Sequence, residues 1–178
     1  MLRNVWNSLL LLVTLAFLFP SCSAHRKTDR SYTTRKSGEM RSSSKSHVST
    51  LRKDIRRYAR RYKGSRYKYA GADPKGFDCS GFTSYVLKKF DVKVSRSSKV
   101  QATEGRKISL RRARPGDLLF FSKSGRGKPS HVALVIDNRS DGLIVVHSTT
   151  SRGVIEENIS QSTYWKPKLL FARDVIDP

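Results

Sequence analysis

The feature that most constrains this chain is a pair of apolar runs within residues 131–148. The runs read HVALVID and GLIVVHS, and the connector between them includes Asp141 and Gly142. Short Val/Ile-rich runs joined by turn residues are typical of a β-hairpin. In an antiparallel hairpin, the start of the first strand lies beside the end of the second. The sequence therefore predicts that His131 and His147 are neighbours.

Helical patterns precede these strands. Residues 79–90 carry Phe82, Val86 and Phe90 at helical spacing, and residues 51–62 carry an apolar stripe followed by Gly64. The stripe consists of Leu51, Ile55, Tyr58, Ala59 and Tyr62. Further strands are predicted in RPGDLLFF and KLLFARDVI. Helices followed by at least four strands indicate the α+β class with a mostly antiparallel sheet, folded as one domain over residues 50–178.

The first residues have the pattern of an export signal. Arg3 precedes an apolar run at residues 9–19, which is shorter than the roughly 20 residues that span a bilayer. The run ends in PSC, which resembles a bacterial lipoprotein signal. Residues 1–21 are therefore expected to be removed and Cys22 to be acylated, so that lipid chains hold the protein on a membrane. A plain signal cleaved near Ala24 is the alternative.

Residues 22–49 are rich in Ser and Thr, basic, and nearly free of apolar side chains, which predicts a disordered tether. The formal net charge of the chain is +22. Residues 23–66 hold 15 Lys or Arg and 3 Asp or Glu, a balance of 15 − 3 = +12. An exported chain without an aromatic–basic motif is not expected to bind nucleic acid. A solvated tether, or an anionic envelope surface as partner, explains the charge.

Cys79 lies in the motif FDCSGF, where an extended segment meets the second predicted helix. If Cys22 is acylated, Cys79 has no partner for an internal disulfide. Backbone N–H groups at a helix start favour a thiolate, so a lowered thiol pKa is expected, and they also suit an oxyanion. The histidines that can take the thiol proton are His131 and His147, because His25 and His47 lie in the basic leader or at its end.

Spacing alone leaves other interpretations open. Two core histidines and a small buried cysteine would show the same pattern. A zinc site is disfavoured because only three soft ligands are available, without the short pair spacing of such sites. Thiolate chemistry needs no cofactor, and none is expected.

Five motifs in order give a more specific indication: YKYAGADPKGFDCSGF, SRSSKVQ, RPGDLLFF, SHVALVI and VVHSTTSRGV. Together they resemble the NlpC-type cell-wall endopeptidases, which are exported bacterial cysteine peptidases. The resemblance implies a compact papain-like fold, with the nucleophile at the start of a helix packed on a small antiparallel sheet.

The resemblance also implies site residues. Cys79 falls on the nucleophile, His131 on the base, and His147 on the orienting residue, which would accept the Nδ1–H of His131. Tyr67 falls on the tyrosine beside the oxyanion. Asp78, Ser80 and Arg96 are expected to contact substrate or line its groove, with Ser97 and Gln101 in the same motif as Arg96. Gly76 and Gly81 are expected to allow a tight turn and close approach of substrate.

The implied activity is hydrolysis of an amide bond in peptidoglycan stem peptides or cross-links, by a monomer anchored through Cys22. Ser23 does not look like an inner-membrane retention signal, which favours the outer membrane, facing the periplasm. An amidase or acyltransferase on the same scaffold, and a non-catalytic wall-binding module, are the alternatives. The sequence does not indicate which bond is cut.

Overall fold

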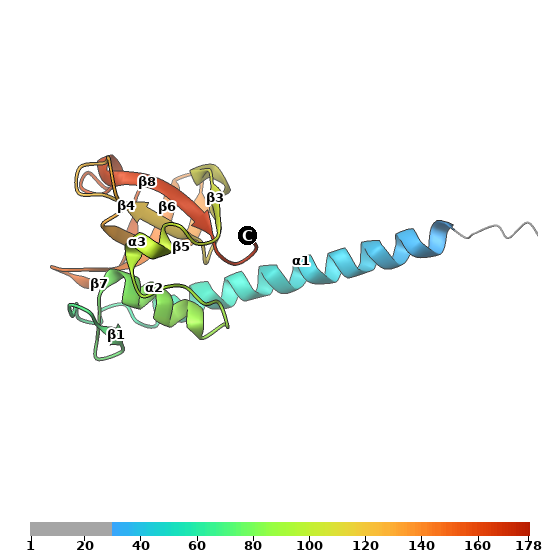
Figure 1. Cartoon of the computed structure of the whole chain (residues 1–178), viewed down its shortest axis with the longest axis horizontal. Helices are drawn as coiled ribbons and strands as arrows, with labels where there is room; N and C mark the ends of the chain where they lie inside the picture. Colours follow the sequence, from blue (N-terminus) through green and yellow to red (C-terminus); the bar gives the residue numbers. More distant parts are fainter. Residues whose placement is uncertain (1–29) are drawn as a thin grey trace, which may run out of the picture.

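The computed structural model describes residues 30–178, with side chains from residue 40 onward. Its centre is a six-stranded antiparallel sheet with strand order β3-β8-β4-β5-β6-β7 (Figure 1). The strands are β3 (Arg106–Ile108), β4 (Leu118–Phe121), β5 (His131–Arg139), β6 (Gly142–Thr149), β7 (Gly153–Asn158) and β8 (Leu169–Asp174). This confirms the predicted α+β class and antiparallel sheet.

The remaining elements are short, apart from one long helix. They are α1 (Arg30–Arg60), β1 (Ala72–Asp73), β2 (Gly76–Phe77), α2 (Cys79–Lys88), α3 (Ser98–Gln101) and the 3₁₀ helices η1 (Leu110–Arg112) and η2 (Lys166–Lys168). Strands β1 and β2 form a separate two-stranded ribbon immediately before α2. None of these helices is long and apolar enough to cross a bilayer.

The predicted hairpin is strands β5 and β6. Leu134 pairs with Val146 in their antiparallel register. Because side chains alternate along a strand, His131 and His147 lie on the same face of the sheet, as diagonal neighbours. The register therefore brings the two imidazoles together, as the sequence predicts.

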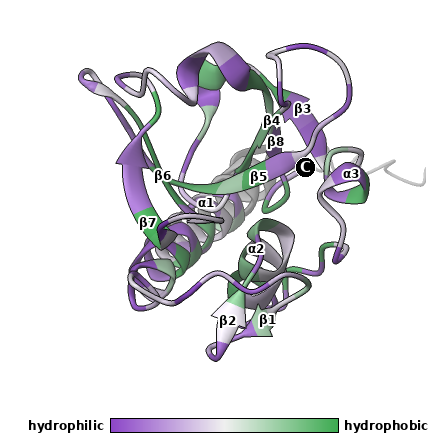
Figure 2. Cartoon of the chain, turned by 90° about the vertical axis from the view of Figure 1, so that its left-hand side faces the viewer, coloured by the Kyte–Doolittle hydropathy of each residue, from purple (hydrophilic) through white to green (hydrophobic). Residues whose placement is uncertain are grey.

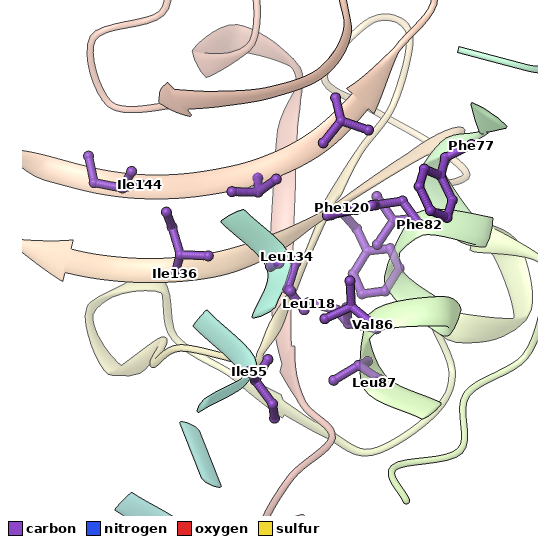
Figure 3. Close-up of a cluster of buried hydrophobic side chains, with 14 of the residues drawn as sticks. Ile55, Phe77, Phe82, Val86, Leu87, Leu118, Phe120, Leu134, Ile136 and Ile144 are labelled. Atoms are coloured by element: carbon purple, nitrogen blue, oxygen red, sulfur yellow. The ribbon is translucent and has the colours of Figure 1, made fainter. Parts of the chain in front are cut away.

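Helices α1 and α2 lie on the same side of the sheet (Figure 2). Phe82, Val86 and Leu87 of α2 are fully buried against side chains of β4 and β5 such as Phe120 and Leu134 (Figure 3). Burying an apolar side chain of this size stabilises the fold by about 1.5–3 kcal/mol. This packing fixes the first residue of α2, Cys79, relative to the sheet.

Helix α1 shows one confirmed prediction and one correction. Ile55 and Ala59 of the predicted stripe are fully buried in the core. The helix, however, begins at Arg30 and extends away from the domain (Figure 1), so residues 30–49 are helical where a disordered tether is predicted. That segment has one glycine and no proline. A packed helical end supplies the costly nucleus, from which helix extends at little further cost. Residues 1–29, including Cys22, lie outside the described part.

A buried ion network attaches α1 to the sheet. Arg52 Nη1 donates to Asp117 Oδ1 at 2.7 Å, and its Nη2 donates to Asp174 Oδ1 at 2.8 Å. All three side chains are at most 5% exposed. Arg114 also donates to Asp174, from the solvent side, at 2.9 Å. The network joins the C-terminal third of α1 to the residue before β4 and to the last residue of β8.

The opposite face of the sheet has its own apolar cluster. It includes Leu119, Phe121, Ala133 and Val145, and the indole of Trp165 packs against it. His131 and His147 belong to this face by register. The segment between β7 and β8 therefore covers the sheet where the histidines lie.

Candidate active site

A groove of about 500 Å³ lies where α2, β5 and β6 meet. Cys79, His131 and Tyr67 line it, together with Trp165 and polar residues that follow β6. These three residues were assigned to the site from the sequence, and they come from three separate segments. His147 lies behind the groove, fully buried.

Cys79 is the first residue of α2, as predicted. Asp78 is the N-cap of this helix, and its Oδ1 accepts the backbone N–H of Gly81 at 2.7 Å. The cap satisfies one of the unpaired N–H groups of the first turn and leaves others free near the sulfur. These free N–H groups suit a developing oxyanion.

The acidity of Cys79 differs from the sequence prediction. Burial raises the pKa of the Cys79 thiol, and this effect exceeds the lowering effect of a hydrogen bond from the backbone of Val132. The cysteine packs against the apolar core, where a lone thiolate is poorly solvated. The contact with Val132 also places the sulfur at the start of β5, next to His131. Cys79 therefore rests as a neutral thiol that needs a base.

The two histidines form a direct hydrogen bond. His131 Nε2 lies 2.9 Å from His147 Nδ1. The sequence analysis predicts that Nδ1 of His131 makes this bond, and that choice of atom is wrong. The diagonal placement of the two residues directs Nε2 of His131 toward β6. Nδ1 of His131 remains available. Burial, and next the neighbouring His147, lower the pKa of His131 well below its ordinary value, so the ring is neutral and can accept a proton.

Trp165 is a site residue that the sequence analysis missed. Its ring stacks on His131, with centroids 4.4 Å apart and an angle of 24° between the planes, and it meets His147 edge-on at 5.1 Å. Stacking of this kind holds both imidazoles in place and excludes water from one side. The adjacent aromatic pair Tyr164 and Trp165 was the only signal in the sequence.

Tyr67 lies on the groove wall, and its backbone forms a bridge with Phe77 two residues before Cys79. Burial raises the pKa of Tyr67, and the neighbouring Cys79 and Asp78 raise it further. Its hydroxyl therefore stays protonated and can donate a hydrogen bond within the groove.

Asp78, Ser80 and Arg96 contact one another. Arg96 donates from Nη1 and Nη2 to the two oxygens of Asp78, both at 2.8 Å, and also from Nη1 to Ser80 Oγ at 3.0 Å. Such a two-bond fork is geometrically specific. None of the three lines the groove, as far as its described wall shows. These bonds hold the start of α2, and a contact of these residues with substrate stays a prediction.

The structural reason for a glycine at position 81 differs from the predicted one. A Cβ at this position would collide with the carbonyl oxygen of Gly71 and with the Arg96 guanidinium. The glycine is therefore needed where the loop before β1 crosses the first turn of α2, rather than for approach of substrate. Gln101 is also structural, because it is buried and bonds to Thr83 and Ser80.

The NlpC/P60 family model matches residues 64–174, which is more than half of the chain and includes all the groove residues. The match begins after α1 and ends at the last residue of β8.

Two relatives illustrate the similarity. The Gamma-DL-glutamyl hydrolase of Bacillus subtilis (strain 168) is 43% identical over 115 residues, covering 63% of this chain and 27% of that protein. The murein DD-endopeptidase MepS/murein LD-carboxypeptidase of Escherichia coli (strain K12) is 35% identical over 116 residues, covering 65% of this chain and 58% of that protein. The chain thus matches only part of the length of each.

Solved structures agree with the fold. An NlpC/P60 family protein from Bacillus cereus ATCC 10987 superposes with a TM-score of 0.65 at 29% identity, over 70% of this chain and 40% of that one. The NlpC/p60 domain of the peptidoglycan hydrolase SagA superposes with a TM-score of 0.55 at 32% identity, over 67% of this chain and 95% of that domain. The predicted papain-like fold of this family is confirmed, and the chain belongs to the NlpC/P60 family.

Proposed function

We propose that this protein is a cysteine peptidase that hydrolyses an amide bond in the peptides of peptidoglycan. The observation that carries the proposal is the 2.9 Å bond between the two imidazoles beside Cys79. A thiol, a neutral base and an orienting partner are the three parts of a nucleophilic site.

The reaction would proceed in two steps. Nδ1 of His131 takes the proton of Cys79 as the sulfur attacks the carbonyl carbon of the substrate. Free N–H groups at the start of α2 and the hydroxyl of Tyr67 hold the oxyanion. His131 then protonates the leaving amine, and a thioester remains on Cys79. Water attacks the thioester with His131 as base, which releases a carboxylate and restores the thiol.

The choice of substrate rests on two supports. The names of the relatives refer to murein in one case and to γ-glutamyl bonds in the other. Lys123 and Arg152 are also on the groove wall. Peptidoglycan peptides carry free carboxylates, and cations at the groove favour an anionic substrate.

Digestion of purified muropeptides, read by mass spectrometry, tests this function. A peptidase separates the stem or cross-link at one peptide bond. Release of the whole peptide from the glycan would instead indicate an amidase, and transfer to an added amine an acyltransferase. Unchanged muropeptides in the presence of folded protein would indicate a wall-binding module and overturn the proposal.

The same proposal places the protein in the cell envelope. We infer export by the signal in residues 1–21 and anchoring through Cys22 to the outer membrane, facing the periplasm, as a monomer. The PSC boundary after a short apolar run supports export and the anchor, and Ser23 after the cysteine supports the outer membrane.

Metabolic labelling with a palmitate analogue checks the anchor. Wild-type protein and the Cys79→Ala variant are expected to carry the label, and Cys22→Ala is expected to lose it, because Cys22 is the proposed site of acylation. Retained label in Cys22→Ala would show that acylation at this position is wrong.

A further inference from the structure

The second ring nitrogen of His147 has an incomplete environment. The side chain is fully buried. Its Nδ1 faces His131, and its Nε2 makes no hydrogen bond of good geometry within the described structure. A buried imidazole N–H without an acceptor is unfavourable, because it has lost its bond to water and gained none in the protein. The Nε2 atom therefore needs a partner.

Glu157 is the group placed to supply it. Oε2 of this residue lies 3.5 Å from His147 Nε2, which is within reach but longer than an ordinary hydrogen bond. Nε2 of His147 is thus without a hydrogen bond only because its distance to Glu157 Oε2 lies at the upper limit for such a bond. A movement of about 0.5 Å would bring it to normal length.

The carboxylate of Glu157 is itself held firmly. Arg152 Nη2 donates to its Oε2 at 2.8 Å, and Ser162 Oγ donates to its Oε1 at 2.7 Å. The contact with His147, followed by the bonds from Ser162 and Arg152, lowers the pKa of Glu157 to about 2 although burial opposes this. The group is therefore ionised at neutral pH and can only accept hydrogen bonds.

An acceptor at this position determines the protonation of both rings. Nε2 of His147 must carry its proton, so Nδ1 of the neutral ring has a lone pair. That lone pair accepts a hydrogen bond from Nε2–H of His131. His131 then has no proton on Nδ1, the nitrogen that remains for the thiol of Cys79.

We propose that Glu157 is a positioning residue that fixes the tautomers of His147 and His131, so that Nδ1 of His131 is the free base. The predicted effect on rate rests on the proposed function, whereas the predicted effect on the tautomers does not. Carboxylates that orient a metal-ligating histidine through its second ring nitrogen contribute about 10- to 100-fold, and we expect an effect of the same size here.

The charge of Glu157 has a second consequence. His147 is surrounded by Glu157 and Arg152 on the β7 side, by His131 on β5, and by the neutral Trp165. The other titratable groups of the site are Cys79 on α2 and, on the groove wall, Tyr67, Lys123 and Tyr164. Burial lowers the pKa of His147 most strongly, Glu157 opposes this, and Arg152 reinforces it. Removing the carboxylate charge should therefore make the imidazole pair less basic.

The experiment uses the full chain labelled with ¹⁵N-histidine. Long-range ¹H–¹⁵N spectra near neutral pH identify which ring nitrogens are protonated, and the signals of His147 are those lost in His147→Gln. The wild type is expected to show Nε2–H on both His131 and His147. Glu157→Gln should keep this pattern, because its amide oxygen, held by Arg152, can still accept. Glu157→Leu should give mixed tautomers.

Activity provides the second readout. We expect kcat/KM to fall about tenfold in Glu157→Gln and about 100-fold in Glu157→Leu. In Glu157→Gln the acid limb of the pH profile should also move to lower pH, since a less basic imidazole pair becomes protonated only at lower pH. Glu156→Gln is the matched control. It removes the same charge from the preceding residue, whose carboxylate pairs with Arg60 and Lys63, away from the histidines.

Wild-type tautomers in Glu157→Leu would overturn the proposal. If Glu157→Leu does not fold, the pH profile of Glu157→Gln decides. The proposal is overturned as well if the acid limb of Glu157→Gln lies at the same pH as the acid limbs of the wild type and Glu156→Gln. If wild-type protein cleaves no muropeptide but Glu157→Leu still changes the tautomers, the proposed function fails and the role of Glu157 stands.

Discussion

Replacing His131 by alanine is expected to lower kcat for muropeptide hydrolysis by at least about 10³-fold, close to the effect of removing Cys79. The thiol pKa is raised by burial, so the cysteine has little thiolate of its own and depends on the base. The neutral ring of His131 is that base in our account, and no other imidazole lines the described groove.

His147 is expected to tolerate a conservative change. In the proposed tautomers its Nδ1 accepts a hydrogen bond from Nε2–H of His131, 2.9 Å away, and an amide oxygen can do the same. His147→Asn or His147→Gln should therefore keep measurable activity, whereas His147→Ala should lose much more. Initial rates on one purified muropeptide, with folding checked by circular dichroism, make the comparison. Equal inactivity of His131→Asn and His147→Asn, or a tolerant His131, would contradict the assigned roles.

Replacing Arg52 by alanine is expected to lower the free energy of unfolding by about 3–5 kcal/mol, because it leaves the buried carboxylate of Asp117 without its cation and that of Asp174 with only the exposed Arg114 and Arg106. Asp117 and Asp174 are nearly inaccessible to solvent, so water cannot take the place of the guanidinium. Arg57→Ala is the control on the same helix. Its exposed pair with Asp54 should contribute less than about 1 kcal/mol. Urea denaturation followed by circular dichroism measures both.

The pH dependence of this loss follows from the two carboxyls. Burial raises the pKa of Asp117 from 3.8 to about 6 despite the bond from Arg52, so ionisation of Asp117 lowers the stability of the fold as pH rises from 3.8 to about 6, and this cost is constant at higher pH. Burial also acts on Asp174, but hydrogen bonds from Asp177 and Arg52 hold its pKa at about 2. Its stabilising effect is thus present above pH 3.8 and is lost as pH falls through about 2.

Without Arg52 both pKa values should rise, and the folded protein should take up protons at higher pH than the wild type. The deficit of Arg52→Ala should therefore be largest above pH 6 and shrink as pH falls toward 4. A deficit below 1 kcal/mol at neutral pH, or one that grows on acidification, would contradict the role given to this network.

The sequence predicts those parts of the fold that are determined by residues close together in the chain. The β5–β6 hairpin and the start of α2 at Cys79 were predicted because alternation, turn residues and helical spacing are properties of neighbouring residues. The position of β8 between β3 and β4 was not predicted, since pairing between distant segments produces no periodic pattern of apolar residues in either segment. The extent of α1 was missed because a Ser-rich sequence has low helix propensity of its own, and packing further along the chain decides the outcome.

The features of the candidate site also divide into those that the sequence predicts and those that depend on packing. The proximity of His131 to His147 follows from strand register, which the sequence indicates. The nitrogen atoms that meet, and the raised pKa of Cys79, depend on side-chain packing and burial, which motifs do not contain. Trp165 contacts the histidines only because the segment between β7 and β8 turns back over the sheet, so nothing in its own neighbourhood indicates a role. Glu157 lies in β7, whose register with β6 places it diagonal to His147, and the sequence analysis did not predict this strand.

The measurement that tests the central claim most directly is muropeptide hydrolysis by wild-type protein and Cys79→Ala, purified side by side and read by mass spectrometry. Our account predicts that the wild type cleaves one peptide bond. Cys79→Ala should show no cleavage above background while keeping the circular dichroism spectrum and unfolding midpoint of the wild type, because the sulfur is the group that attacks. Cleavage of the same bond by a folded Cys79→Ala protein at a rate close to that of the wild type would contradict the account.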